Sequence, residues 1–219
     1  MTGKRRNDPA NLSLRPDHGW QRAPVSDKAM PVMSDSAASA PKYGEIPQKT
    51  IVLVGMMGVG KTTVGRKLAD MLDIPFFDAD HEIEKAANMS VSDIFSELGE
   101  ASFRQGERRV IRRLLKGPRH VLATGGGAFA DEKTRTLVKE TAISVWLQAE
   151  IDVILRRTGK RDTRPLLRQG DPRETLSRLL KQREQFYAQA DIAIVSKDGP
   201  HKLTADRILD ELAKLGQQD

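Results

Sequence analysis

A glycine-rich segment that ends in Lys-Thr carries the most specific chemistry in the sequence. Residues 55–62 read Gly-Met-Met-Gly-Val-Gly-Lys-Thr and match the pattern G-x-x-x-x-G-K-[ST]. Glycines at this spacing let the backbone fold tightly, so that its N–H groups point at phosphate oxygens, and the lysine adds a full positive charge. The hydroxyl of Thr62 can ligate Mg²⁺. The residues expected to bind the phosphates of ATP are Gly58, Val59, Gly60, Lys61, Thr62 and Thr63.

The residues on either side favour a phosphate-binding loop over an ordinary glycine-rich turn with a surface lysine. The preceding run, 51–54, is apolar and rich in β-branched residues, as in a strand that is buried on both faces. The following residues, 61–72, have the apolar spacing of a helix. A strand, a loop and a helix in this order form the context in which the pattern binds a nucleotide.

Two aspartates, Asp78 and Asp80, follow the next apolar run, which we interpret as a strand over 74–77. On an extended segment alternate side chains point the same way, and ligands lie at the carboxyl ends of parallel strands. We therefore expect one carboxylate to hold a metal-bound water. The other would accept a hydrogen bond from an acceptor hydroxyl and could also take its proton. The alternative is that Asp80 only caps a helix that begins at His81.

Three consecutive glycines, 125–127, follow an apolar run at 121–123 that we interpret as another strand. Glycine costs backbone entropy, so such a run is justified where a ligand approaches the main chain closely. The alternative is a flexible loop. Arg104 and Arg183 lie on predicted helices. By itself Arg104 is an ordinary helix-surface arginine, whereas Arg183 could point inward as an anchor for an anion.

A basic segment lies between residues 156 and 168. Its cations are Arg156, Arg157, Lys160, Arg161, Arg164 and Arg168, against a single acid, Asp162. A short polycationic loop suits a lid that closes over phosphates, excludes water and brings an arginine onto the charge that develops in the transition state. The alternative is a solvated basic loop, which could also contact RNA.

The arrangement of apolar runs predicts the fold that holds these residues. Five short apolar runs alternate with helical patterns, which is typical of a parallel sheet covered by helices on both faces. We therefore predict an α/β protein with three α/β/α layers and a five-stranded parallel sheet. The predicted strands are 51–54, 74–77, 121–123, 143–147 and 192–195, and the predicted helices are 61–72, 90–98, 101–116, 131–139, 172–190 and 203–215.

The first 49 residues differ in composition from the rest of the chain. They hold six of the eleven prolines and only five Leu, Ile or Val, so they cannot bury enough apolar surface to offset the entropy of ordering. We predict that residues 1–48 form a disordered extension and that 49–219 form one domain. A targeting or partner-binding arm is the alternative, but no apolar stretch follows the basic residues 4–6, as a signal peptide would require.

The overall composition excludes several kinds of site. The chain has 219 residues, a net charge of +6, four histidines and no cysteine. Disulfides, thiolate zinc sites and cysteine nucleophiles are therefore excluded, and a histidine metal site is disfavoured. No apolar run approaches the roughly 20 residues of a membrane-spanning helix. Half of the excess charge lies in residues 1–49, so the charge is weak support for nucleic-acid binding.

Taken together, these segments resemble the shikimate kinases, a P-loop family related in fold to the nucleoside-monophosphate kinases. The resemblance covers about residues 50–215 and rests on motifs in the family's order. They are G-M-M-G-V-G-K-T at 55–62, F-D-A-D at 77–80, F-R-Q-G-E at 103–107, T-G-G-G at 124–127, R-P-L-L at 164–167 and R-E-Q-F-Y at 183–187. The first motif is generic to P-loop proteins, and the others are specific. The family often has Ser or Thr where Ala79 stands, but that residue is expected to point away from the site.

The resemblance implies ATP-dependent phosphorylation of the 3-hydroxyl of shikimate, a step in aromatic amino-acid biosynthesis. It implies that both Arg104 and Arg183 pair with the substrate carboxylate. It also implies that Glu107 orients Arg104. The shikimate-binding residues implied are Asp80, Arg104, Gly126, Gly127 and Arg183.

The resemblance also implies how the nucleotide is held. Thr62 and, through water, Asp78 would hold Mg²⁺, and Arg157 would lie over the adenine. Arg164 would be the arginine of a mobile lid at about 157–171. The catalytic residues implied are Lys61, Asp80 and Arg164.

Two other functions stay open as alternatives. They are a related small-molecule kinase of the gluconate type and a non-catalytic nucleotide-binding regulator. We expect a cytoplasmic monomer whose partners are shikimate and ATP, with no nucleic acid and no membrane.

Overall fold

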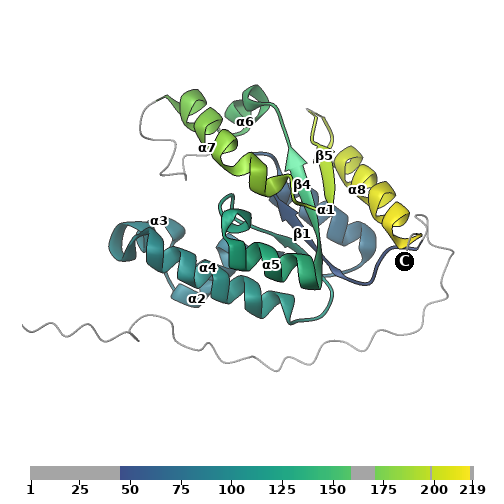
Figure 1. The fold of residues 1–219 in the computed structure, drawn as a ribbon, viewed down its shortest axis with the longest axis horizontal. Helices are drawn as coiled ribbons and strands as arrows, with labels where there is room; N and C mark the ends of the chain where they lie inside the picture. Colours follow the sequence, from purple (N-terminus) through teal and green to yellow (C-terminus); the bar gives the residue numbers. More distant parts are fainter. Residues whose placement is uncertain (1–44, 159–170, 198, 218–219) are drawn as a thin grey trace, which may run out of the picture.

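Five parallel strands form the centre of the structure. The computed structural model describes residues 45–158, 171–197 and 199–217. Within these residues the strands are β1 (Thr50–Val54), β2 (Phe76–Asp78), β3 (Val121–Ala123), β4 (Ala142–Gln148) and β5 (Ile192–Val195), in the spatial order β2-β3-β1-β4-β5 (Figure 1). All neighbouring strands pair in parallel. The predicted five-stranded parallel sheet is thus confirmed.

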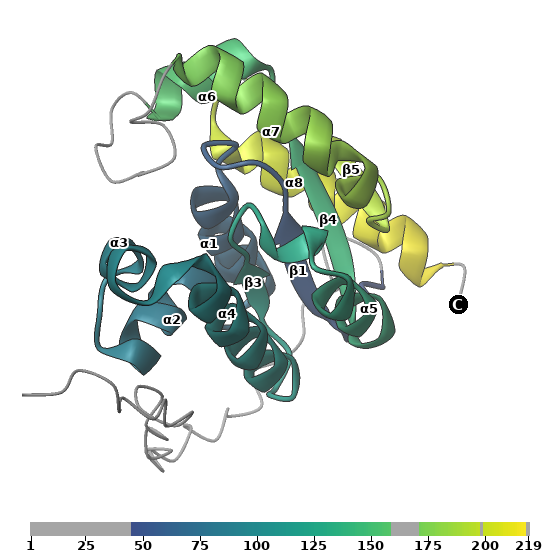
Figure 2. The ribbon, with the colours of Figure 1, turned by 60° about the vertical axis from the view of Figure 1, so that its left-hand side comes forward.

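Helices cover both faces of this sheet. In the described residues they are α1 (Lys61–Leu72), α2 (Ala79–Ala87), α3 (Val91–Asp93), α4 (Gly99–Leu115), α5 (Glu132–Thr141), α6 (Ile151–Thr158), α7 (Pro172–Tyr187) and α8 (His201–Gly216). Helices α1 and α8 pack against each other on one face, and α4, α5 and α7 lie on the other (Figure 2). The predicted three-layer architecture is therefore confirmed. Among the described helices, none is both long and apolar enough to cross a membrane.

The strands differ in burial, and their shared direction determines where the site lies. Every residue of β1 and β3 is buried, whereas β5, at the edge, alternates buried and exposed residues. The apolar run at 51–54 therefore occupies the middle of the sheet, as its lack of alternation predicts. Because the strands are parallel, the loops that follow β1, β2 and β3 all emerge at the same edge of the sheet.

Several predicted elements have different bounds in the structure, and three of these differences have a local cause or consequence. The helix predicted at 90–98 is the short α3 followed by a π-helical turn, η1 (Ile94–Leu98). Ser90 caps α3, because its Oγ accepts a hydrogen bond from the N–H of Asp93 at 3.1 Å. The strand predicted at 74–77 starts later, after Pro75, which has no N–H to offer to a strand ladder. The helix predicted to reach residue 190 ends at Tyr187.

The first part of the basic segment is helical, which corrects the prediction of a loop over 156–168. Helix α6 runs through Thr158, so Arg156 and Arg157 lie on a helix and not in a lid. The apolar residues Val153 and Ile154 are buried and dock this helix on the rest of the molecule. The pattern was missed because the helix is short and its last turn is basic.

The other end of the predicted lid also belongs to a helix. Asp171 is the N-cap of α7, and its carboxylate accepts a hydrogen bond from the N–H of Arg173 at 2.9 Å. An Asp at the N-cap followed by Pro at the first helical position is a typical helix start. The rest of the predicted lid, residues 159–170 with Arg164, lies outside the described residues.

The described chain begins with a segment that packs on α8. Ile46 contacts the hydrophobic core. A Cβ placed on Gly216, the last residue of α8, would overlap the carbonyl group of Glu45. Residues 45–49 are therefore part of the packed molecule.

Candidate active site

The glycine-rich segment 55–62 wraps around the N-terminus of α1. Gly58 and Gly60 have φ angles of 79° and 102°, in the left-handed region that favours glycine. At Gly58 a Cβ would also lie 2.6 Å from Cγ2 of Thr158, so the loop packs directly on α6. The first N–H groups of α1 have no partner within the helix, which makes this end of α1 a favourable place for phosphate.

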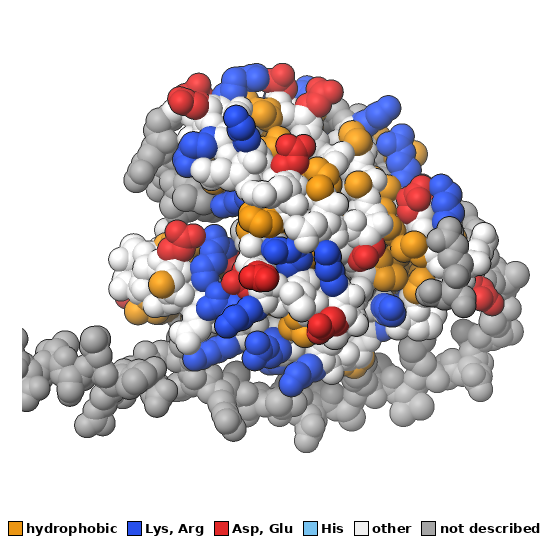
Figure 3. Space-filling view, viewed as in Figure 1, with side chains coloured by type: hydrophobic (Ala, Val, Ile, Leu, Met, Phe, Trp, Pro, Cys, Tyr) orange, Lys and Arg blue, Asp and Glu red, His pale blue; other side chains and the backbone are white. Residues whose placement is uncertain are grey.

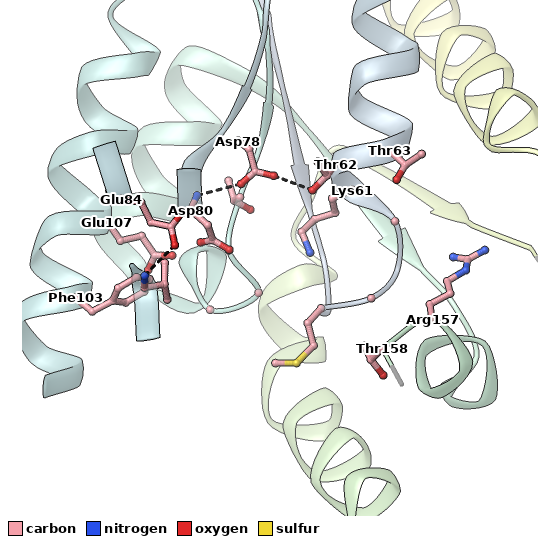
Figure 4. Close-up of a pocket in the computed structure, with 18 of the residues that line it drawn as sticks. Lys61, Thr62, Thr63, Asp78, Asp80, Glu84, Phe103, Glu107, Arg157 and Thr158 are labelled. Carbon is pink, nitrogen blue, oxygen red and sulfur yellow. Dashed lines mark hydrogen bonds between the residues drawn. The ribbon is translucent and has the colours of Figure 1, made fainter. Parts of the chain in front are cut away.

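The side chain of Lys61 reaches into a cavity beside this loop (Figure 4). Its ammonium group donates hydrogen bonds to the carbonyl oxygens of Gly55 and Met56 at 2.8 and 2.9 Å. The residue is only 8% exposed. The loop thus holds a buried positive charge next to the backbone N–H groups that would face a phosphate.

Asp78 links the phosphate-binding loop to the end of β2. Its Oδ2 accepts a hydrogen bond from the hydroxyl of Thr62 at 2.7 Å. Its Oδ1 accepts from the N–H of Asp80 at 3.1 Å, which makes Asp78 the N-cap of α2. The alternative that Asp80 caps a helix starting at His81 is therefore wrong, because the helix begins two residues earlier.

Asp80 lies in the first turn of α2 and not on an extended segment, which corrects the reasoning from strand alternation. Both aspartates nevertheless line the same cavity (Figure 4). Ala79, between them, is fully buried and does not line it, as expected. The cap at Asp78 turns the chain sharply enough to leave both carboxylates on the cavity side.

Arg104 and Glu107 form an ion pair on α4. Nη1 of Arg104 donates to Oε2 of Glu107 at 2.7 Å, and Glu100 accepts from the same guanidinium at 3.2 Å. Burial raises the pKa of Glu107, although the positive charge of Arg104 acts in the opposite direction. Burial also opposes the charge of Arg104, but the two carboxylates outweigh it and raise the pKa of the guanidinium. Glu107 therefore holds Arg104 from the next turn of the helix, as expected.

The run of three glycines makes room for these side chains. A Cβ on Gly125 would lie 2.7 Å from Oε1 of Glu107 and 3.0 Å from Oδ1 of Asp80. A Cβ on Gly127 would lie 2.6 Å from Nη2 of Arg104. The run is therefore explained by the close approach of the protein's own side chains, in addition to any ligand.

Arg183 reaches the same glycines from α7. Its Nη1 donates to the carbonyl oxygen of Gly126 at 3.1 Å. A Cβ on Gly126 would lie 3.5 Å from this Nη1, and Gly127 is in contact with Arg104. Adjacent glycines thus bring together two guanidinium groups that lie on different helices and far apart in the sequence.

Arg157 lies across the cavity from Asp80 and Glu107 (Figure 4). It donates to the carbonyl oxygen of Val59 at 3.0 Å and to that of Lys197 at 3.2 Å. His201, at the start of α8, lines the cavity beside it. Burial and the charge of Arg157 lower the pKa of His201. The guanidinium therefore joins the phosphate-binding loop to the loop before α8.

The cavity has a volume of about 580 Å³ and contains most of the predicted site. The surface is hollowed between the part formed by α3 and α4 and the part formed by α7 (Figure 3). Val59 is buried and contributes its carbonyl to Arg157, and Arg164 lies outside the described residues. The predicted residues that line the cavity are Gly58, Gly60, Lys61, Thr62, Thr63, Asp78, Asp80, Arg104, Gly126, Gly127, Arg157 and Arg183.

Sequence reasoning missed several residues that line the cavity. They include Phe95, Thr124, Thr158 and His201. Thr124 directly precedes the glycine run, so its position at the end of a strand was a usable signal. His201 and Thr158 carry no such signal, because only the packing of α6 and α8 around the loop brings them to the cavity.

Comparison with known proteins identifies relatives along most of the chain. A model of the family described as shikimate kinase matches residues 57–213. Shikimate kinase from Novosphingobium aromaticivorans is 53% identical over 178 residues, which cover 80% of this chain and 92% of that protein. Shikimate kinase from Bradyrhizobium diazoefficiens is 50% identical over 187 residues, or 85% of this chain and 87% of that one.

Two solved structures are similar to this one. Shikimate kinase from Acinetobacter baumannii in complex with shikimate has a TM-score of 0.74 and 39% identity, and the match covers 76% of this chain and 94% of that chain. Shikimate kinase from Aquifex aeolicus has a TM-score of 0.67 and 32% identity, over 78% of this chain and 99% of that chain. Both matches span nearly the whole length of the other protein.

Proposed function

The chain belongs to the shikimate kinase family and phosphorylates shikimate with ATP in aromatic amino-acid biosynthesis, and we propose that the cavity described above carries out this reaction. One observation carries the proposal. The phosphate-binding loop, Asp80 and the guanidinium groups of Arg104 and Arg183 line a single cavity. A phosphoryl donor and a small acceptor with a carboxylate and a hydroxyl can therefore lie side by side in it.

The nucleotide occupies the side of the cavity formed by the loop, α1 and α6. The N–H groups of residues 58–63 bind the phosphates, and Lys61 supplies the charge that a transferring phosphoryl group needs. Lys61 is held in place for this role by the carbonyl oxygens of Gly55 and Met56. Arg157 lies over the adenine, and Arg164, which is outside the described residues, is proposed to supply positive charge to the phosphates.

Thr62 and Asp78 fit a magnesium ion. Their contact at 2.7 Å offers a hydroxyl and a carboxylate oxygen, which are ligands of the kind that Mg²⁺ prefers. Mg²⁺ is usually bound through one or two protein oxygens together with substrate phosphates. In the described residues no group of three or more His, Asp or Glu could hold a metal alone, which agrees with that arrangement. A bound Mg²⁺ would neutralise charge on the phosphates of ATP.

The acceptor occupies the side formed by α2, α4, α7 and the glycine run. Arg104 and Arg183 bind the carboxylate of shikimate, because a guanidinium pairs with a carboxylate through two parallel hydrogen bonds. Gly126 and Gly127 contact the acceptor through their backbone. The ion pair with Glu107 keeps Arg104 in the required direction.

Asp80 aligns the 3-hydroxyl of shikimate and accepts its proton as the phosphoryl group is transferred. Phosphoryl transfer needs little covalent chemistry from the protein, so alignment and charge neutralisation account for most of the catalysis. Asp80 is suited to this role because its carboxylate lies beside Gly125, next to the acceptor side, while Asp78 is committed to Thr62.

We predict that Asp80→Asn folds normally and lowers kcat by about 100-fold or more, because proton acceptance and hydroxyl alignment are both lost. The measurement is a coupled ADP-release assay, with thermal unfolding to check folding. Asp93→Asn is a matched control on the exposed cap of α3, outside the cavity. A kcat near that of the parent in Asp80→Asn would refute the role given to this aspartate.

The same assay tests the acceptor. Shikimate is expected to give rapid ADP release, whereas gluconate, which lacks the ring, is expected to give little. Quinate, a related ring with a carboxylate, reports how strictly the ring is recognised. Equal rates with gluconate and shikimate would contradict the assignment of the acceptor side.

The remaining properties are proposals of the same kind. We propose a monomer, because the cavity lined by residues of one chain already offers the groups that the proposed reaction needs. We propose that it works in the cytoplasm, where ATP is available, without nucleic acid or membrane as partners. We also propose that the kinase domain begins at about residue 45, slightly before the predicted residue 49, because Ile46 packs on the core.

A further inference from the structure

Tyr187 is a fully buried polar residue at the end of α7 that the proposed reaction does not use. Its hydroxyl donates a hydrogen bond to the carbonyl oxygen of Gly126, and it lies 3.8 Å from Sδ of Met56. Its ring lies against that of Trp146, with the centroids 5.9 Å apart. Tyr187 therefore touches the glycine run, the phosphate-binding loop and β4 at once.

The carbonyl group of Gly126 receives two hydrogen bonds from one face of α7. Arg183 and Tyr187 are one helical turn apart, so their side chains lie on the same face of the helix. Both donate to this oxygen, Arg183 at 3.1 Å. The orientation of this single peptide group is thus set by α7.

The orientation of that peptide group matters for the acceptor. Because a peptide bond is planar and trans, the N–H of Gly127 points away from the carbonyl of Gly126. Because α7 binds the carbonyl of Gly126, the N–H of Gly127 points away from α7. Gly127 also lies against the guanidinium of Arg104. A rotation of the peptide would therefore disturb the hydrogen bond from Arg183 and the packing against Arg104, and it would redirect the N–H of Gly127.

We propose that Tyr187 is a positioning residue for the acceptor: its hydroxyl holds the Gly126 carbonyl, and thereby sets the Gly127 N–H and the Arg183 guanidinium. The inference rests on the proposed function, in which Arg183 binds the substrate carboxylate and Gly127 contacts the acceptor through its backbone. Burial raises the pKa of Tyr187 to about 12, so its hydroxyl remains a donor throughout the range of a kinase assay.

A structural role alone would have a different consequence. If Tyr187 only filled space against Trp146 and Met56, its ring would matter and its hydroxyl would not. Tyr187→Phe separates the two possibilities, because it keeps the ring and removes only the donor. Arg183 still satisfies the Gly126 carbonyl in that variant, so we expect a modest effect on folding.

The test is steady-state kinetics of Tyr187→Phe. We expect the KM for shikimate to rise about three- to tenfold, as for loss of one hydrogen bond, while the KM for ATP and the melting temperature stay near the parent values. Phe186→Leu is the matched control, because Phe186 is the neighbouring residue but stacks on Arg135 away from the cavity. An unchanged KM for shikimate in Tyr187→Phe, or an equal rise in Phe186→Leu, would overturn the inference.

A double-mutant cycle with Arg183→Ala shows which proposal fails, if one does. We expect Arg183→Ala to raise the KM for shikimate and to reduce the further effect of Tyr187→Phe, because both act through the same peptide. If Arg183→Ala raises the KM and Tyr187→Phe does not, only the role of Tyr187 is wrong. If Arg183→Ala leaves the KM unchanged, the acceptor site itself is wrong, and the inference falls with it.

Discussion

The carboxylate of Glu107 is buried beside the guanidinium of Arg104 and near the carboxylate of Asp80. Its Oε2 pairs with Arg104, whereas its Oε1 is buried with no hydrogen-bond partner among the described residues. Burying a charged carboxylate costs free energy of folding unless a partner of opposite charge compensates it. The cost is understandable if Glu107 serves to hold Arg104 against the glycine run, where an acceptor carboxylate would bind.

We predict that Glu107→Gln raises the KM for shikimate about tenfold with little change in the KM for ATP, because Arg104 loses its charged partner. The parent enzyme should show the same loss as the pH falls. Burial raises the pKa of Glu107, so protonation and loss of the ion pair start at a higher pH than for an ordinary glutamate.

The measurement is the KM for shikimate between about pH 7.5 and about pH 5, in the parent and in the variant. The parent value should rise toward acid, and the Gln variant should have a flatter profile. Parallel profiles in the two proteins would show that another group is responsible.

His120 illustrates a buried residue that acts on stability and not on the reaction. Its Nδ1 lies 2.8 Å from the carbonyl oxygen of Pro118, which can only accept, so Nδ1 carries the proton. Its Nε2 is buried without a partner among the described residues, and its ring packs edge-to-face with that of Phe77, with the centroids 5.0 Å apart. A second proton would place a charge in this apolar surrounding.

We predict that the protein loses stability as the pH falls below about 6.5, the ordinary pKa of histidine. Burial lowers the pKa of His120 in the folded state. The unfolded chain therefore binds the proton first, and acid favours unfolding until the lowered pKa is reached. The check is the melting temperature against pH. His120→Asn, whose amide can still donate to Pro118, should have a smaller slope in this range, and an equal slope would contradict the assignment.

At the scale of elements, the site depends on how closely helices approach the loops at one edge of the sheet. Helix α4 brings Arg104 to Gly127, and α7 brings Arg183 to Gly126. The side chains of the two helices meet at the glycine run. A Cβ on Gly127 would collide with Arg104, whereas a Cβ on Gly126 would make ordinary contact with Arg183. Gly65 has a comparable role in packing, since a Cβ there would lie 2.6 Å from Cε2 of Phe76.

We predict that Gly127→Ala and Gly65→Ala fail in different ways. The new methyl group at residue 127 meets the guanidinium at the far end of the Arg104 side chain, so the KM for shikimate should rise about ten- to a hundredfold with a normal melting temperature. At residue 65 it meets the core side chains of Phe76 and Leu53, so stability should fall by about 1–3 kcal/mol. Kinetics and urea unfolding of both variants separate the two effects. A stable Gly127→Ala protein with the parent KM would contradict the packing described.

At the scale of the whole molecule, the order of the strands brings the donor and acceptor sides together. β1 lies between β3 and β4, so the phosphate-binding loop emerges beside the glycine run that follows β3. β2 lies on the other side of β3, and so Asp78 and Asp80 border the same cavity. Neither neighbour of β1 is the next strand along the chain, whereas β2 and β3 are consecutive strands.

We predict that deletion of residues 1–44 changes kcat and both KM values by no more than about twofold, because all assigned site residues follow β1. The cut must leave Ile46 in place, since this residue packs on the core. Deletion of residues 1–49 is the contrasting variant and should lower the melting temperature. A collapse of activity in the shorter deletion would show that the first 44 residues contribute to the reaction.

The sequence alone determined the features that depend on neighbouring residues. The phosphate-binding loop, the alternation of strands and helices, and the caps at Ser90 and Asp171 follow from local periodicity and backbone conformation. The three consecutive glycines were also visible, although their reason was not. The helix over 151–158 and the cap at Asp78 were missed, because in each case a short local signal was ambiguous.

Only the tertiary structure decided which of these residues meet. By its local sequence Arg104 was an ordinary helix-surface arginine and Arg183 a candidate anchor for an anion, and only the packing of α4 and α7 brought them to adjacent glycines. The carbonyl of Gly126, shared by Arg183 and Tyr187, has no signature in the sequence at all. The physical reason is that a site of this kind is built from contacts between distant segments. Strand order and helix packing set those contacts, whereas residue periodicity sets only the elements themselves.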